Sequence, residues 1–390
     1  MAVQQGYGKL AGTDALVFAY DRDDARNSYK GAPTVNLLEQ PGASSLPSRS
    51  DIYNNVTKTD LGNGKYRFVN DGTGGTTVRV YVTATDFEPD AIYTCSVSYE
   101  DFQPGDGNSL TLDWCDRGNQ SFSLSQYGSA NRVSITTFRE ANPHIPGFFD
   151  ISIAPNASVV LFDAQVEKLS YATPYTNNER PSTESLYNLV NSQPIDLVNT
   201  SFDGQGNFTF DGIADYIDCG DIVSGKVTFS AESWVKTTDT RVGANSSYKN
   251  PSIFGTQHGS GASGDFALCV MNGTLGYYAE LGSTGYRDSG VFVADDLWHH
   301  LAVTKDSSGV IKLYVDGVEV YSRTGNTGTL RTTDLQQYHW EVGRAYWRGE
   351  DSTMLRFNGD IATHRFYDRA LSASEILNNY NNQKTKYNLL

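Results

Sequence analysis

The chain has 390 residues, enough for two or three domains. Its 30 Lys and Arg residues stand against 45 Asp and Glu residues, a formal net charge of −15. This charge repels the phosphate backbone of nucleic acids and disfavours nucleic-acid binding. Charged residues make up 19% of the chain and aromatic residues 12%, a composition that excludes general disorder.

Strand signals dominate the first half of the chain. Residues 1–13 hold three glycines and little that could form a core, so they predict an N-terminal arm that docks on a partner chain. Residues 14–21 predict a first strand. Further short runs of alternating β-branched or aromatic residues lie at 78–85, 92–99, 109–114, 132–137, 149–153 and 159–166. Their spacing predicts an all-β sandwich.

A polar segment with two prolines, residues 170–184, predicts a linker or a closing strap between domains. More strand signals follow it, at 207–210, 216–219, 227–236, 266–271 and 276–280. In the clearest hairpin, residues 298–305 and 310–315 pair, and Asp316-Gly317 predicts a primed two-residue turn into a strand at 318–321. The apolar residues that share one face of this hairpin are predicted core: Leu301, Val303, Ile311, Leu313 and Val315.

One helix is well marked, at residues 371–380. Ser372 is its N-cap, and Glu375 completes a capping box. Leu371 and Ile376 form a hydrophobic staple across the same turn. We expect this short helix to pack against the edge of the second sandwich.

The cysteines are Cys95, Cys115, Cys219 and Cys269, and none forms a CxxC pair, which disfavours a zinc site. We expect four free thiols, with a Cys95–Cys115 disulfide as the alternative. No apolar run approaches the roughly 20 residues of a membrane helix. The N-terminus shows no charged segment followed by an apolar one, so we expect no secretion signal and no membrane insertion.

Four segments of the second half occur in an informative order. They are residues 210–217 (Phe210-Asp-Gly-Ile-Ala-Asp-Tyr-Ile217), 229–235, 298–304 with 313–317, and 357–362 with 367–371. In this order and spacing they resemble the laminin-G-like, concanavalin A-like lectin/glucanase superfamily. The resemblance covers about residues 185–380 and implies a β-sandwich of that type.

The first strand signal is similar to the leading strand that comes just before such a domain, yet the continuation is delayed to residues 185–189. Residues 162–175 resemble the end of a carbohydrate-binding-module-like jelly roll. We therefore predict an arm (1–13), a leading strand of the C-terminal sandwich (14–31), an inserted carbohydrate-binding-module-like β-sandwich (32–172), a linker (173–184) and a laminin-G/concanavalin A-like β-sandwich (185–390). The predicted fold class is all-β, with two antiparallel jelly-roll sandwiches, the arm and a short C-terminal helix.

A glucan-cleaving member of this superfamily would carry Glu-x-Asp-x-Glu along one strand, because alternation then places all three carboxylates on one face. The chain has no such run. Glu232 and Glu341 stand alone, and we predict that both are surface or capping carboxylates. No Gly-x-Ser-x-Gly nucleophile elbow occurs either. We predict no enzymatic activity.

His299 and His300 are adjacent on a predicted strand, so they point to opposite faces and cannot hold one metal together. We expect structural, hydrogen-bonded roles for both. The prediction is no cofactor, although the resemblance implies calcium as an option. The carboxylates considered for calcium are Asp295, Asp296, Glu350, Asp351 and Asp360, and they form no spaced ligand motif.

A sugar site combines an exposed aromatic face with polar side chains. Tyr346, Trp347 and Arg348 lie in a polar loop between two predicted strands and fit that description. These three residues are the predicted glycan-binding or interface site. The alternative is that Trp347 packs against a neighbouring domain or subunit.

The combination of the two sandwiches is similar to structural proteins of tailed bacteriophages. This second resemblance implies a virion protein on the particle exterior, such as a head fibre, a decoration or a collar or tail-fibre component, assembled in the host cytoplasm. Its expected partners are other virion proteins, a host surface glycan and further copies of the chain. The alternative is a glycan-binding module of a bacterial surface protein, and an endoglycosidase ranks third.

Overall fold

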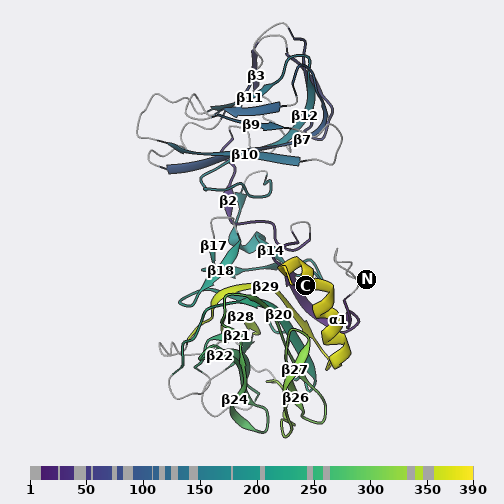
Figure 1. The fold of residues 1–390 in the computed structure, drawn as a ribbon, viewed down its shortest axis with the longest axis vertical. Coiled ribbons are helices and arrows are strands. Elements are labelled where there is room, and N and C mark those ends of the chain that lie inside the picture. The colour runs from purple at the N-terminus through teal and green to yellow at the C-terminus, as the bar shows by residue number, and fades with distance from the viewer. Residues whose placement is uncertain are drawn as a thin grey trace. The chain divides into compact units, whose positions relative to one another are not determined.

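The computed structural model describes residues 10–24, 27–38, 50–53, 56–72, 77–81, 91–107, 109–113, 119–123, 131–139, 148–176, 179–202, 207–243, 249–257, 264–331, 339–345 and 355–389. The chain divides into two compact units (Figure 1). The C-terminal unit combines Met1–Gly31 with Ser182–Asp203 and Asn207–Leu390. The inserted unit consists chiefly of Ala32–Pro181. The C-terminal unit is therefore discontinuous in sequence.

The inserted unit is a sandwich of two five-stranded antiparallel sheets. The first has the order β10 (Asn131–Arg139), β7 (Ala91–Gln103), β12 (Ser158–Glu167), β5 (Tyr66–Asn70) and β4 (Val56–Asp60). The second has the order β3 (Ser50–Tyr53), β6 (Thr77–Tyr81), β11 (Phe148–Ile153), β8 (Ser109–Asp113) and β9 (Asn119–Ser123). Alternation along β7 places Tyr93, Cys95, Val97 and Tyr99 in the core between the sheets.

Part of the predicted linker forms regular structure. β13 (Glu179–Arg180) pairs antiparallel with β2 (Thr34–Val35) in the inserted unit. The Arg180 side chain is buried and donates to the backbone oxygen of Ala32. A short 3-10 helix, η2 (Ser182–Glu184), then begins the return to the C-terminal unit.

The C-terminal unit packs an eight-stranded sheet on a seven-stranded one, both antiparallel. The first has the order β17 (Ser201–Phe202), β18 (Phe208–Asp211), β29 (Asn358–Tyr367), β20 (Phe229–Lys236), β25 (Trp298–Lys305), β26 (Ile311–Val315) and β27 (Val318–Arg323), with β1 (Leu16–Asp21) also on β29. The second has the order β16 (Leu197–Val198), β19 (Tyr216–Asp218), β28 (Glu341–Val342), β21 (Ser252–Thr256), β22 (Phe266–Met271), β23 (Thr274–Glu280) and β24 (Thr284–Phe292). The short strands β14 (Leu186–Tyr187) and β15 (Pro194–Ile195) form a separate pair. The predicted all-β fold class is confirmed.

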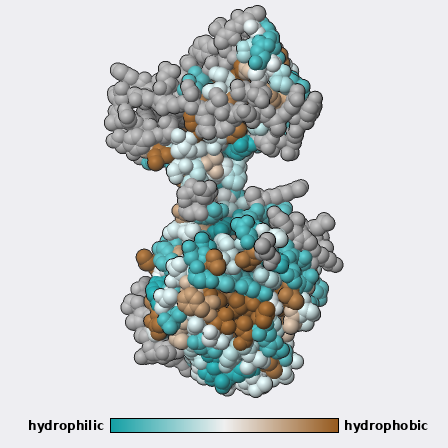
Figure 2. Space-filling view, viewed as in Figure 1, coloured by the Kyte–Doolittle hydropathy of each residue, from teal (hydrophilic) through white to brown (hydrophobic). Residues whose placement is uncertain are grey.

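Hydrophobic residues also gather on the described surface of the C-terminal unit. Figure 2 shows them as one patch bordered by hydrophilic residues.

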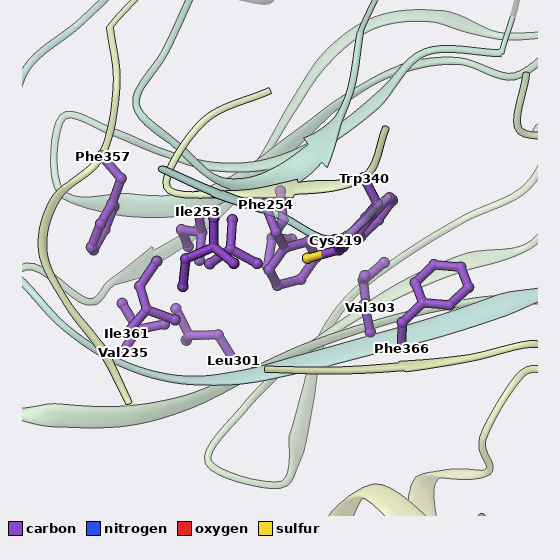
Figure 3. Close-up of a cluster of buried hydrophobic side chains, with 14 of the residues drawn as sticks. Cys219, Val235, Ile253, Phe254, Leu301, Val303, Trp340, Phe357, Ile361 and Phe366 are labelled. Atoms are coloured by element: carbon purple, nitrogen blue, oxygen red, sulfur yellow. The ribbon is translucent and has the colours of Figure 1, made fainter. Parts of the chain in front are cut away.

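The core of this unit lies between the two sheets. Phe254 of β21 and Trp340, the residue before β28, point toward Leu301 and Phe366 of the eight-stranded sheet (Figure 3). All five predicted core residues of the hairpin belong to this core, as predicted. Asp316 and Gly317 have positive φ, as a primed turn requires.

β1 completes the eight-stranded sheet from far away in the sequence. It pairs antiparallel with β29, with Phe18 opposite Phe366 and Tyr20 opposite His364. Phe18 is 2% exposed and Tyr20 is fully buried. The leading strand is thus an integral part of the C-terminal core.

Helix α1 (Ala373–Gln383) begins with the predicted capping box of Ser372 and Glu375. It covers the outer face of the eight-stranded sheet rather than the edge we expected, because Ile376 packs with Tyr314 and Tyr367. The helix is longer than predicted because Gln383 is buried and accepts a hydrogen bond from the Trp234 indole, 2.7 Å away. A 3-10 turn, η4 (Lys384–Tyr387), follows it.

The described part of the N-terminal arm packs on this same helix. Leu10 is buried, and the Ala11 amide donates to Asn379 Oδ1 at 2.8 Å. A Cβ on Gly12 would lie 2.5 Å from a Leu371 methyl carbon, so the backbone approaches the helix start closely. Residues 10–13 are therefore held by their own chain, and docking of the arm on a partner stays a prediction. Residues 1–9 lie outside the described residues.

The cysteines in the described ranges are all buried. Cys219 and Cys269 are free thiols, and burial raises the pKa of each. Cys95 lies in β7 and Cys115 lies outside the described ranges. Among the residues that the structure describes, no helix is both long and apolar enough to span a membrane.

Candidate functional site

The predicted loop site at Tyr346, Trp347 and Arg348 lies outside the described residues, as do Glu350 and Asp351. Each of the remaining carboxylates considered for calcium has a basic partner: Asp295 with His299, Asp296 with Lys236, and Asp360 with Arg22. No cluster of three or more metal-ligating side chains occurs within the described ranges.

The two adjacent histidines point to opposite faces, as predicted. The ring nitrogens of His299 lie 2.8 Å from Asp316 Oδ2 and 3.1 Å from Asp295 Oδ1. The hydrogen bond with Asp316 raises the pKa of His299, although burial lowers it. His300 points under α1, where its Nε2 lies 3.4 Å from Glu232 Oε2. His299 makes the hydrogen bonds we expected, and His300 lies in the buried cluster around Glu232.

The prediction that Glu232 is a surface or capping carboxylate is wrong. It is fully buried beneath α1, where Tyr367 donates to Oε1 at 2.8 Å and the Asn379 amide donates to both oxygens. Arg365 Nη1 lies 3.5 Å from Oε1. Burial alone would raise the pKa of Glu232, but His300, Arg365 and Tyr367 lower it to about 2. This carboxylate anchors the helix to the sheet.

The same prediction for Glu341 is also wrong. Its side chain is 4% exposed and receives a bidentate pair of 2.8 Å bonds from Arg344, whose guanidinium lies over the ring of Tyr216. Burial raises the pKa of Glu341 despite Arg344. The sequence could not indicate that Glu341 is buried, because its strand has two residues and so shows no alternation of polar and apolar positions.

A different site emerges in the inserted unit, on the outer face of the β10-β7-β12-β5-β4 sheet. Because Tyr93, Cys95, Val97 and Tyr99 face the core, the alternate residues of β7 face outward. These outward residues are polar throughout: Thr94, Ser96, Ser98 and Glu100. Residues 169–176, here called the strap, cross one end of this face, since Leu169 O accepts from the Thr94 hydroxyl at 2.8 Å.

Arg132 and Asp163 lie side by side where the strap ends. Arg132 donates to Ser98 Oγ at 3.1 Å, Ser96 Oγ at 2.6 Å and the Asp163 backbone oxygen at 2.7 Å. Among the described residues these neutral groups are its only hydrogen-bond acceptors, and burial lowers its pKa. Asp163 sits at a bulge of β12, with a φ of 52° that is uncommon for a residue with a side chain.

The Asp163 carboxylate accepts no hydrogen bond from any described residue and remains partly exposed. Burial raises its pKa, while the charges of Arg132 and Lys65 oppose that rise. The Tyr175 hydroxyl lies within electrostatic reach of both groups, and burial together with Asp163 raises the pKa of Tyr175 to about 12. A polar group with a perturbed pKa on a strained backbone is typical of a binding site.

Two ion pairs and an aromatic ring extend this surface away from the strap. Lys65 lies 2.6 Å from Glu100 and stands over the ring of Phe162. Arg67 pairs with Asp101, and this bond lowers the pKa of Asp101. We call the surface formed by these residues the open face: Lys65, Arg67, Ser98, Glu100, Asp101, Arg132, Phe162, Asp163 and Tyr175.

The open face has the chemistry of a site for hydroxyl-rich ligands. Asp163 can accept hydrogen bonds from hydroxyl groups, Arg132 can donate to oxygens, and the aromatic residues Phe162 and Tyr175 belong to the same surface. Sequence reasoning missed it because polar residues on alternate strand positions are also what a solvated sheet face shows. The one usable signal was the run of small hydroxyl residues at 94, 96 and 98, which leaves room above a strand.

Comparisons with solved structures find distant likenesses. Domain 4 of an extracellular arabinanase from Geobacillus stearothermophilus, in complex with arabinotriose, is 21% identical over 49% of this chain and 84% of its own, with a TM-score of 0.34. A Ruminococcus gnavus sialidase carbohydrate-binding domain, bound to sialyllactose, is 16% identical over 44% of this chain and 94% of its own, with a TM-score of 0.36. The receptor-binding domain of botulinum neurotoxin D is 15% identical over 51% of this chain and 50% of its own, with a TM-score of 0.36.

The search of curated proteins finds no match to this chain. The family comparison falls in the C-terminal unit and agrees with the resemblance of its four segments. Residues 211–377 match the model of the concanavalin A-like lectin/glucanases superfamily.

Proposed function

We propose that this chain is a non-enzymatic glycan-binding protein and that a sugar docks on the open face of its inserted unit. The observation that carries the proposal is the Asp163 carboxylate, which is partly exposed, accepts no hydrogen bond from a described residue and belongs to a residue whose backbone oxygen is bonded by Arg132. A carboxylate of this kind gains hydrogen bonds when sugar hydroxyls replace water, at little cost in rearrangement. The superfamily match of residues 211–377 supports a lectin-like protein.

A chemical argument supports binding without bond cleavage on the open face. Glycoside hydrolysis needs two carboxyl groups across the scissile bond, one to protonate and one to attack or activate water. Glu100 and Asp101 are both held by ion pairs with Lys65 and Arg67. Among the described residues of the open face, Asp163 is the one carboxylate without a cationic partner at ion-pair distance. One available carboxylate supports binding without hydrolysis.

We further propose a place on the exterior of a virion, as a head fibre, a decoration or a collar or tail-fibre component assembled in the host cytoplasm. The resemblance of the two-sandwich combination to bacteriophage structural proteins supports this. The apolar patch on the C-terminal unit (Figure 2) is typical of a protein contact and supports assembly with virion proteins or further copies of the chain. Antibody-labelled particles viewed by electron microscopy should carry label outside the shell, and particles without label would contradict the placement.

Tyr346, Trp347 and Arg348 remain a proposed second contact, for a glycan or for a neighbouring subunit. Trp347→Ala separates the two uses. Loss of glycan binding alone favours the sugar, and loss of particle assembly alone favours the interface. If neither changes, this loop is not a contact site.

The glycan proposal is tested on an array with the full chain and Asp163→Asn. Asn tolerates the positive φ of this position, so the fold is kept while the charge is removed. Hydrogen bonds to charged groups are about twice as strong as neutral ones, so about tenfold weaker binding is expected. Asp60→Asn, at the exposed β4–β5 turn, is the matched control and should bind as the parent does. Equal binding by the parent and Asp163→Asn would overturn the proposed site.

A further inference from the structure

The strap closes one end of the sheet face and is fixed there from several sides. The Thr173 amide donates to Glu167 Oε2 at 2.9 Å, and the Thr176 amide donates to Gln165 Oε1 at 2.7 Å. Glu167 and Gln165 are both fully buried, so neither bond competes with water. The strap is therefore a fixed wall of the inserted unit.

Exposure changes sharply along β7. Thr94 and Ser96, beneath the strap, are fully buried, and Ser98 is 8% exposed. Beyond them the side chains of Glu100 and Asp101 are 29% and 49% exposed. The sheet face is thus closed at the Thr94 end and accessible at the Glu100 end.

Asp163 stands at the boundary between these two regions. Arg132, which bonds its backbone oxygen, contacts Ser96 on the covered side and Ser98 on the accessible side. The strap reaches this boundary, because the Thr176 amide bonds Gln165, two residues after Asp163, and Tyr175 lies within electrostatic reach of the Asp163 carboxylate. A ligand bound to Asp163 consequently meets the strap on one side, and the accessible surface continues from there toward Glu100 and Arg67.

We infer that the open face takes the end of a glycan chain, with the terminal sugar at Asp163 against the strap, and not a segment from the interior of a chain. From Ser98 to Gln103 the accessible stretch is about 17 Å at about 3.3 Å per residue, the length of about three linked sugar rings. The second and third sugars lie beside Lys65, which covers the Phe162 ring, and beside the Arg67–Asp101 pair. This inference rests on the proposed function and adds the class of glycan that the same site accepts.

The test is calorimetric titration of the full chain with cello-, malto- and N-acetylglucosamine oligomers of one to six units. In a series that binds, affinity should rise up to three units and then stay constant to six. Asp163→Asn should weaken binding of two-unit and three-unit oligomers alike by about tenfold. Arg67→Ala should weaken the three-unit oligomer severalfold and leave the two-unit oligomer unchanged, and Asp60→Asn should change neither.

Sedimentation with a long polymer of the same sugar gives an independent readout. End recognition predicts that the number of bound proteins follows the number of chain ends and does not grow with polymer length. Affinity that keeps rising beyond three units, or many proteins along one polymer, would overturn the inference while leaving glycan binding intact. If neither these series nor any glycan on the array binds to the parent chain, the proposed function itself fails, and this inference with it.

Discussion

Replacing Phe18 with Ala tests whether a strand near the N-terminus stabilises the C-terminal unit. Phe18 is 2% exposed, belongs to that unit's core and pairs with Phe366 across β1 and β29. Truncating a buried phenylalanine costs about 3–5 kcal/mol, against a usual domain stability of about 5–15 kcal/mol. At about 2–4 °C per kcal/mol for a unit of this size, the melting temperature should fall by about 6–20 °C.

Scanning calorimetry of the full chain measures this shift, with the transitions assigned through a second variant. Phe68→Ala removes a fully buried side chain from the inserted unit and should lower the other transition. Phe292→Ala is the control in the C-terminal unit, because that ring is 51% exposed and its loss should cost under about 1 kcal/mol. If Phe18→Ala leaves both transitions within about 2 °C of the parent, β1 does not belong to that core.

Three further predictions concern charge and redox state. The folded-state pKa of His299 is raised, so the stabilisation that protonated His299 contributes is complete below its unfolded pKa of about 6.5 and is lost as pH rises through its folded pKa. Urea unfolding from pH 6 to 9 should show this loss of stability, and His299→Gln should abolish the pH dependence. The pKa of Glu232 is lowered to about 2, so its stabilisation is present above about pH 4.3 and is lost as pH falls toward 2. Glu232→Gln leaves Arg365 buried without its counter-charge, so urea unfolding at pH 7 should show a loss of about 3–5 kcal/mol, and a loss under 1 kcal/mol would contradict the anchoring role. Thiol titration of the denatured, unreduced protein should count four thiols, and a count of two would indicate a Cys95–Cys115 bridge.

Local patterns predicted the elements that depend on local chemistry. The capping box of Ser372 and Glu375 and the turn at Asp316-Gly317 are both observed, because each is a set of neighbouring residues that satisfies its own backbone. The hairpin core followed from alternation alone. The full length of α1 could not be predicted from local patterns, because the burial of Gln383 under Trp234 depends on contacts between residues distant in sequence.

The roles of isolated polar residues could not be predicted in this way. Glu232 looks like an exposed acid on its strand, yet residues from β25, β29 and α1 converge on it in the fold. The surroundings of Asp163 are likewise formed by a bulge of its own strand, by Arg132 on another strand and by the strap. Each of these sites is assembled from segments whose pairing the sequence does not reveal.

The central claim is that the Asp163 carboxylate binds sugar hydroxyls on the open face. The most direct measurement is the chemical shift of labelled aspartate carboxyl carbons during titration with a glycan that binds on the array. The account predicts that the signal lost in Asp163→Asn shifts and saturates with the binding isotherm, while the Asp60 signal stays in place. A saturating isotherm that leaves the Asp163 signal unmoved would contradict the claim and place the sugar elsewhere.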